Sequence, residues 1–216
     1  TGPSPFPHWP PTADFLEQYP NQYVFFDAAT REWVVSYPDS GSQQGTQRSE
    51  LRFSSHADVM PLVSAHVVKL ADGTFSYSYD LGNKMGARNA IARWTLLVPV
   101  GDEKFRATHA NWKADRNESG NPRVINSGAR RLAELHWSPP TSNAALAAGS
   151  AASGFSVNSS FPPGFSMIAA KGQVSREFSP SIAASLPKAA ADQLARVLEP
   201  AFDSARQIVL GPWFYP

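Results

Sequence analysis

Large and small side chains alternate without interruption over residues 75–81, whose sequence is FSYSYDL. A period of two places successive side chains on opposite faces of a strand. The segment therefore predicts a half-buried antiparallel strand whose aromatic face covers a core. Residues 62–70 alternate in the same manner, and the Asp72-Gly73 pair between the two segments predicts a hairpin with a tight primed turn. The side chains expected on the core face are Phe75, Tyr77, Tyr79 and Leu81, with the first and last mostly buried.

Further short segments carry strand patterns bounded by turn residues. Such strands, with many turns and few helical patterns, predict a mainly β protein built as an antiparallel β-sandwich, Ig-like or jelly-roll-like. The segments are Tyr23–Asp27, Arg31–Tyr37, Ala90–Val100, Arg130–Trp137, Ser153–Ser159 and Phe165–Gly172.

One C-terminal segment departs from this trend. Residues 187–208 are rich in alanine and place larger apolar side chains near helical spacing, which predicts one C-terminal α-helix. Pro187 suits the first helical position, and Pro200 should end or kink the helix. We therefore expect an extended Pro-rich arm over 1–12, a β-sandwich over 13–186, the helix and a final strand over 187–210, and an aromatic tail over 211–216.

Composition excludes several kinds of chemistry. The 216 residues carry 19 basic and 18 acidic side chains, so the net charge of +1 gives no case for nucleic acid or an anionic membrane as partner. The chain has no cysteine, which excludes disulfides and thiolate metal centres. No apolar run reaches the roughly 18–20 residues of a membrane span. Neither a phosphate-binding loop nor a dinucleotide-binding fingerprint occurs, so we expect no cofactor.

The start of the chain bears on its location. Thr1 is not preceded by Met, and five prolines follow within residues 1–12. Such a start is typical of a mature chain after removal of a signal peptide, although a trimmed chain would look the same. We expect an extracellular, periplasmic or cell-envelope location.

Several stretches resemble exported bacterial Ig-like β-sandwich proteins of unassigned function. The resemblance rests on residues 75–83 followed by 91–99, and on Gly154–Ser159 leading to Pro163-Gly164. It extends over half the chain and implies export and a sandwich fold. It implies no catalytic residue.

One segment resembles a calcium-binding loop. Asp115, Asn117 and Ser119 place oxygen atoms at alternate positions before Gly120, the arrangement that a hard cation prefers. Asn126 stands where such a loop carries a bidentate Glu. We therefore favour the alternative, an exposed polar turn over 115–121 that binds no ion tightly.

Candidate catalytic groups are sparse. The five histidines have no metal-site spacing, and no Gly-x-Ser-x-Gly elbow is present. Trp33, Trp94 and Trp137 are expected mostly in the core. A carbohydrate-binding module or a glycoside hydrolase-like protein would instead need an aromatic-lined groove with carboxylates nearby. The groove candidates are Trp112, His136 and Trp137, with Asp115 or Glu134 beside them.

Both ends of the chain are rich in apolar residues. Exposed aromatic side chains in extended segments suit an interface, although each end could equally fold back on its own domain. The interface candidates are Phe6, Trp9, Trp213, Phe214 and Tyr215. The favoured function is a non-enzymatic secreted or envelope module with a structural or binding role, whose partner is itself or another envelope protein. The carbohydrate-active protein is the alternative.

Overall fold

The computed structural model describes residues 7–38, 48–101, 104, 106–117, 132–174, 176, 178–198 and 204–213. The chain forms two compact units. The first unit comprises residues 1–55 and 174–203, and the second comprises residues 56–173 and 204–216. The expectation was a single sandwich over 13–186, whereas in the structure residues 1–55 and 174–203, which lie far apart in the sequence, combine into the first unit.

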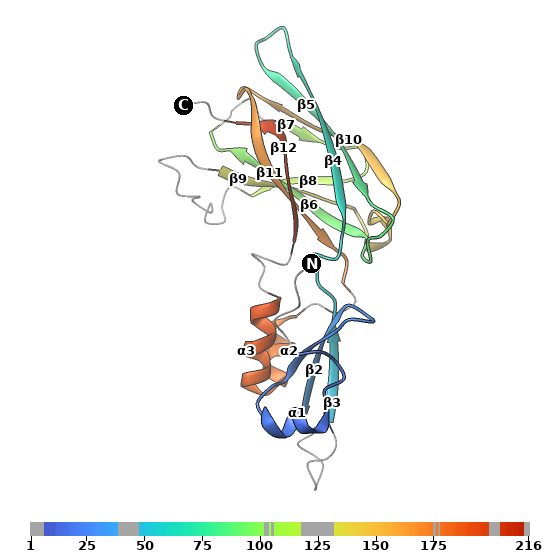
Figure 1. The fold of residues 1–216 in the computed structure, drawn as a ribbon. Coiled ribbons are helices and arrows are strands. Elements are labelled where there is room, and N and C mark those ends of the chain that lie inside the picture. The colour runs from blue at the N-terminus through green and yellow to red at the C-terminus, as the bar shows by residue number, and fades with distance from the viewer. Residues whose placement is uncertain are drawn as a thin grey trace. The chain divides into compact units, whose positions relative to one another are not determined.

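The first unit packs helices on a small antiparallel sheet with strand order β1-β2-β3 (Figure 1). Its core joins Val35 and Phe53 of the sheet to Leu194 of a helix. The side-chain amide oxygen of Gln193 also accepts the backbone N–H of Tyr23 at 3.0 Å, which ties the helix to the start of the sheet. The elements are α1 (Ala13–Gln18), β1 (Val24–Asp27), β2 (Glu32–Pro38), β3 (Arg48–Phe53), α2 (Pro180–Ser185) and α3 (Lys188–Val197).

The predicted C-terminal helix is present as α3, which ends before Pro200 as expected, and two further short helices, α1 and α2, were not predicted. The described residues contain three α-helices, and the helix that follows Pro187 ends at Val197. Pro187 is the N-cap of α3 instead of its first helical residue. The predicted final strand is present beyond this helix. No helix among the described residues is both long and apolar enough to cross a bilayer.

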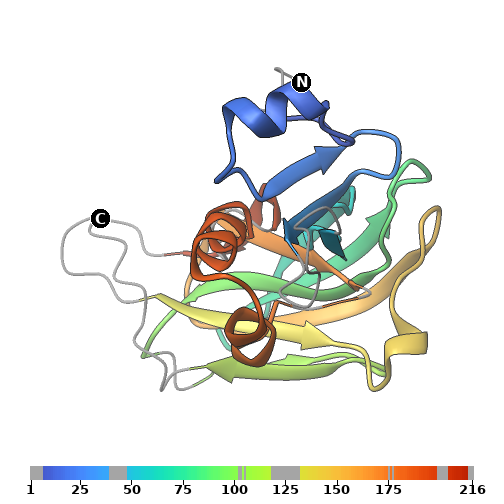
Figure 2. The ribbon, with the colours of Figure 1, turned by 90° about the horizontal axis from the view of Figure 1, so that it is seen from below.

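The second unit is an open antiparallel β-sandwich. One sheet has the strand order β4-β5-β10-β7 and the other has the order β12-β11-β6-β9-β8 (Figures 1 and 2). The strands are β4 (Pro61–Lys69), β5 (Phe75–Asn83), β6 (Ile91–Pro99), β7 (Arg106–Thr108), β8 (Lys113–Asn117), β9 (Leu132–Ser138), β10 (Ala151–Ser159), β11 (Pro163–Gly172) and β12 (Ala205–Pro212), and the short helix η1 (Ser142–Ala144) precedes β10.

The alternation over residues 75–81 has the predicted effect. Tyr77, Tyr79 and Leu81 are buried, whereas Ser78 and Asp80 on the opposite face are exposed. Phe75 is partly buried at the edge of the same core. The prediction of a half-buried strand is confirmed.

The core lies between the two sheets. Trp94 of β6 contacts Tyr79 of β5 and Phe155 of β10 edge-on, with ring centroids 5.7 and 5.1 Å apart. Phe155 faces inward because a register shift interrupts the pairing of β10 with β5. Gly154 has a φ of +91° at this shift, a conformation that glycine adopts without strain.

The hairpin between β4 and β5 forms, but its turn is not a primed one. Gly73 has a positive φ of +83°, whereas Asp72 does not. The backbone N–H of Gly73 donates to the carbonyl of Leu70, as in a type I turn followed by a left-handed glycine. The Asp72 carboxylate accepts the N–H and the hydroxyl of Thr74, which stabilises this wider turn.

Candidate functional site

The described part of the N-terminal arm lies on its own unit. The backbone N–H of Trp9 donates to the carbonyl of Phe26 at 3.0 Å, and the N–H of Phe26 donates to the carbonyl of Pro7. The indole of Trp9 packs edge-on against Phe25, with ring centroids 5.6 Å apart. Trp9 is therefore engaged within the first unit, while the other N-terminal candidate, Phe6, lies outside the described residues.

At the other end, Trp213 is held against β11. Its backbone N–H donates to the carbonyl of Pro162 at 3.0 Å. A Cβ atom on Gly164 would lie 2.6 Å from the Cβ of Trp213, so only glycine permits this approach. Phe214 and Tyr215 lie outside the described residues.

An exposed apolar surface lies on the outer face of the five-stranded sheet. Phe165 is paired with Leu210, and Met167 with Ile208, in the register of β11 and β12. Phe165 is 74% exposed, Ile208 70% and Leu210 42%. We call these four side chains the β11–β12 strip.

Sequence reasoning missed this strip. Between residues 167 and 170 both the outward and the inward positions of β11 are apolar, because Met167 and Ala169 face outward while Ile168 and Ala170 fill the core. A strand with one solvated face should alternate with polar residues, so this lack of alternation was the available signal. That Leu210 and Ile208 of β12 lie beside Phe165 and Met167 follows only from the strand register in the structure.

The three predicted groove residues do not come together. Trp137 is fully buried and stacks on Trp94 in the core, with ring centroids 4.3 Å apart. His136 is next to it in the strand and so points to the opposite face of β9. Trp112 belongs to the segment between β7 and β8, against Phe155. A groove shared by Trp112, His136 and Trp137 is therefore absent among the described residues.

His136 lies in a polar cluster on the outer face of the five-stranded sheet. Its Nδ1 is 2.9 Å from the hydroxyl of Thr95, and its Nε2 is 3.4 Å from the carboxylate of Glu134. Asp115 is its register partner on β8. Burial lowers the pKa of His136, against the opposing effect of Glu134. The imidazole is therefore mainly neutral at pH 7. The cluster consists of side chains that contact one another across neighbouring strands on an open sheet face.

The calcium candidates do not form the predicted turn. Asp115 and Asn117 belong to β8, where they pair with His136 and Glu134, and Ser119 lies outside the described residues. The extended backbone of a strand does not curl around an ion as a calcium-binding loop does. Among the described residues, no group of three or more His, Asp or Glu side chains could hold a metal ion.

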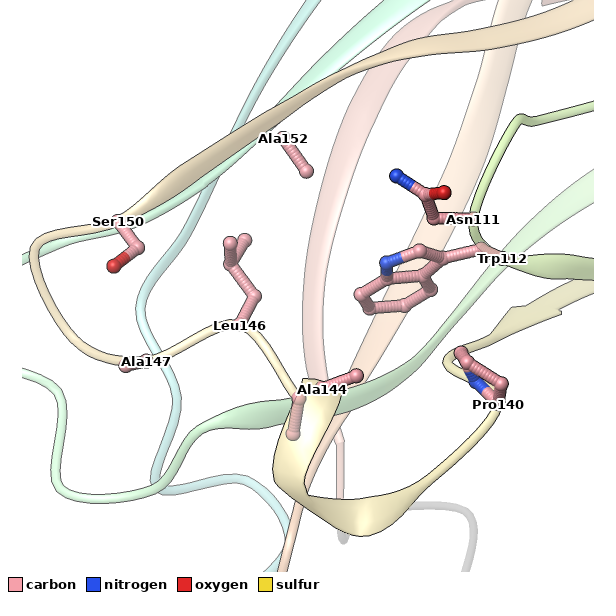
Figure 3. A pocket seen from close by; sticks show the side chains of 9 residues that line it. Asn111, Trp112, Pro140, Ala144, Leu146, Ala147, Ser150 and Ala152 are labelled. Atoms are coloured by element: carbon pink, nitrogen blue, oxygen red, sulfur yellow. The ribbon is translucent and has the colours of Figure 1, made fainter.

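A pocket of about 520 Å³ opens beside Trp112 (Figure 3). Leu146, Ala152 and the indole of Trp112 form its apolar floor, with Asn111 and Ser150 at the rim. Its lining contains no titratable side chain, so the carboxylate pair of a glycosidase is absent from it. The lining residues are Asn111, Trp112, Pro140, Ala144, Ala145, Leu146, Ala147, Ser150 and Ala152.

His109 holds the turn that presents Asn111 and Trp112 to this pocket. Its Nδ1 accepts the backbone N–H groups of Asn111 and Trp112 at 2.9 and 2.8 Å. Its Nε2 lies 3.1 Å from the carbonyl of Ser153, and its ring stacks on Phe155 at 4.1 Å. A nitrogen that accepts two N–H groups carries no proton, so the geometry assigns the neutral imidazole with its hydrogen on Nε2. Burial lowers the pKa of His109, consistent with this form.

No protein family model matches this chain, and no curated protein matches it. Among solved structures, the chain is similar to a protein from Nocardia farcinica described as uncharacterized, with an immunoglobulin-like fold. The two share 12% sequence identity at a TM-score of 0.36, and the match covers 68% of this chain and 96% of the other. The assignment of the second unit as a sandwich rests on its own sheets and core.

Proposed function

We propose that this protein is a secreted or cell-envelope β-sandwich module with a structural role, which associates with a second copy of itself through the β11–β12 strip. The observation that carries the proposal is the exposure of Phe165 and Ile208 on neighbouring strands. Single exposed apolar side chains are common, whereas adjacent large ones on one sheet face are typical of a binding surface.

A second copy suits this surface. All four side chains of the strip are uncharged, so two identical strips can meet in an interface with two-fold symmetry without burying a charge. The net charge of +1 adds little repulsion between copies.

The proposed location follows from the resemblance to exported bacterial proteins and from the low content of charged residues, 17%. A polar surface built mainly from uncharged side chains is common in exported proteins. Fractionation of cells of the source organism, with immunoblotting for this protein, tests the location. Its recovery in the cytoplasmic fraction alone would contradict export.

The self-association is tested by the mass of the particle in solution. Sedimentation of the intact chain over a range of concentrations should show a monomer–dimer equilibrium. The double variant Phe165→Thr/Ile208→Thr should remain monomeric, since threonine keeps the strand propensity and removes the apolar contact. Val68→Thr is the matched control, because Val68 is 60% exposed on the other sheet. An intact chain that stays monomeric throughout, or a double variant that dimerises equally well, would refute the proposal.

A further inference from the structure

The Trp112 pocket has the dimensions and lining of a small-ligand site. Its volume of about 520 Å³ falls within the range of roughly 300–1,000 Å³ typical of such sites. Most of its lining is apolar, with a few polar groups at the edge, the composition that such sites share. It lies away from the β11–β12 strip in sequence and uses none of its residues.

The ligand should be uncharged. No lining residue is ionisable, so a charged group entering the pocket would lose its hydration without gaining an ionic partner. The floor formed by Leu146, Ala152 and Trp112 would equally disfavour a ligand whose every face carries hydroxyl groups. The ligand must therefore present a compact apolar group to the floor.

Polar groups around the floor are available for hydrogen bonding. The side-chain amide of Asn111 and the hydroxyl of Ser150 are exposed, and neither makes a hydrogen bond within the described part of the chain. The indole N–H of Trp112 is likewise without an acceptor among those residues. Figure 3 shows the Asn111 amide beside the edge of the indole that carries this nitrogen. An amide can both donate and accept, so Asn111 complements another amide.

We propose that this pocket binds a neutral sugar that carries an acetamido group. The acetamido methyl would pack on Leu146 and Ala152, and its carbonyl and N–H would meet the Asn111 amide and the indole N–H. The apolar face of the sugar ring would lie against the part of the Trp112 indole that lines the pocket, with its hydroxyl groups toward Ser150 and solvent. His109 is a positioning residue for this site, because it fixes the backbone of both Asn111 and Trp112.

The test is a titration of the full chain with methyl N-acetyl-β-glucosaminide. Calorimetry and the NMR signal of the Trp112 indole N–H are the two readouts. For a ligand of this size we expect saturable binding with a Kd of about 1 mM or below. The indole signal should move with the same saturation. Methyl β-glucoside, which lacks the acetamido group, should bind at least about tenfold more weakly.

Variants connect the binding to the pocket. Asn111→Ala should weaken binding by about tenfold, because Asn111 is exposed and its side chain is not needed for folding. Asn143→Ala is the matched control, an exposed asparagine on η1 that does not line the pocket, and it should bind like the intact chain. The proposal is overturned if neither glycoside saturates, if both bind equally, or if Asn111→Ala leaves the Kd unchanged. None of these outcomes bears on dimerisation through the β11–β12 strip.

Discussion

The side chains of Trp94 and Trp137 stack face to face across β6 and β9, with ring centroids 4.3 Å apart and planes inclined by 9°. The two residues are direct register partners, and both are fully buried. Phe155 of the facing sheet meets both rings edge-on. This aromatic cluster joins the two sheets, and it removes Trp137 from any surface groove.

The buried stack predicts a contrast between two substitutions of Trp137. Trp137→Ala should lower the free energy of unfolding by about 3–5 kcal/mol, through lost burial and the cavity that remains. Trp137→Phe should cost clearly less, because it keeps an aromatic ring and removes an indole N–H that has no acceptor among the described residues. Urea unfolding followed by far-UV circular dichroism measures both. Equal losses for the two variants would show that ring stacking does not stabilise this core.

The two inward tyrosines of β5 should respond differently to removal of the hydroxyl group. The Tyr77 hydroxyl donates to the carbonyl of Phe161 at 2.7 Å, so Tyr77→Phe should cost about 1 kcal/mol of unfolding free energy. The Tyr79 hydroxyl is buried without a partner among the described residues, and burial raises its pKa. Tyr79→Phe should therefore be neutral or stabilising in the same urea experiment. A larger loss for Tyr79→Phe than for Tyr77→Phe would contradict the assigned hydrogen bonding.

Asp27 should make the first unit sensitive to acid. Its carboxylate accepts a hydrogen bond from Arg52 at 2.8 Å and from the backbone N–H groups of Ala29 and Thr30. Arg52, followed by the backbone of Thr30, lowers the pKa of Asp27 from 3.8 to about 2. Because the folded-state pKa lies below the unfolded value, the stabilisation is complete above pH 3.8 and is lost as the pH falls toward 2.

Hydrogen exchange of residues 24–38 between pH 5 and pH 2 measures this loss, after correction for the intrinsic exchange rate. Asp27→Asn should lower protection at pH 5 and flatten its dependence on pH in this window. Asp192→Asn is the control, because Asp192 forms an exposed pair with Lys188 and should leave the profile unchanged. Parallel profiles for the intact chain and Asp27→Asn would contradict this prediction.

His109 should make the turn before β8 sensitive to mild acid. Protonation would place a hydrogen on Nδ1 against the two backbone N–H groups that it now accepts. Burial lowers the pKa of His109 below its ordinary value of 6.5, while the Ser153 carbonyl opposes this effect. The unfolded chain therefore binds the proton more readily, and stability should decline as the pH falls below 6.5.

The NMR signal of the Trp112 indole N–H reports this turn directly. In the intact chain it should shift as the pH falls below 6.5, whereas in His109→Asn it should stay constant, since the Asn oxygen can accept the same N–H groups without titrating. His136 also has a lowered pKa, so His136→Asn is the control and should keep the pH response of Trp112. If the Trp112 signal still shifts with pH in His109→Asn, another titrating group causes the shift and the prediction is wrong.

The local sequence pattern was sufficient to predict which side chains enter the core wherever a strand has one buried face. The alternation over residues 75–81 determined which side chains of β5 enter the core, because a period of two leaves no other arrangement on a half-buried strand. The same rule, applied to neighbours in the chain, already separates His136 from Trp137. The predicted strands within residues 23–37, 90–100 and 153–172 are likewise present in the structure.

Only the tertiary structure decided which distant segments combine. Gln193 hydrogen-bonds to Tyr23 across 170 positions of sequence, and this long-range contact, which no local pattern contains, joins the two ends of the first unit. The β11–β12 strip depends on the register that pairs Phe165 with Leu210, and the pocket depends on a ring nitrogen of His109 that accepts two backbone N–H groups. Sequence determines the face that each side chain takes on its own element. Contacts between elements depend on long-range packing, and in this chain they create both candidate binding surfaces.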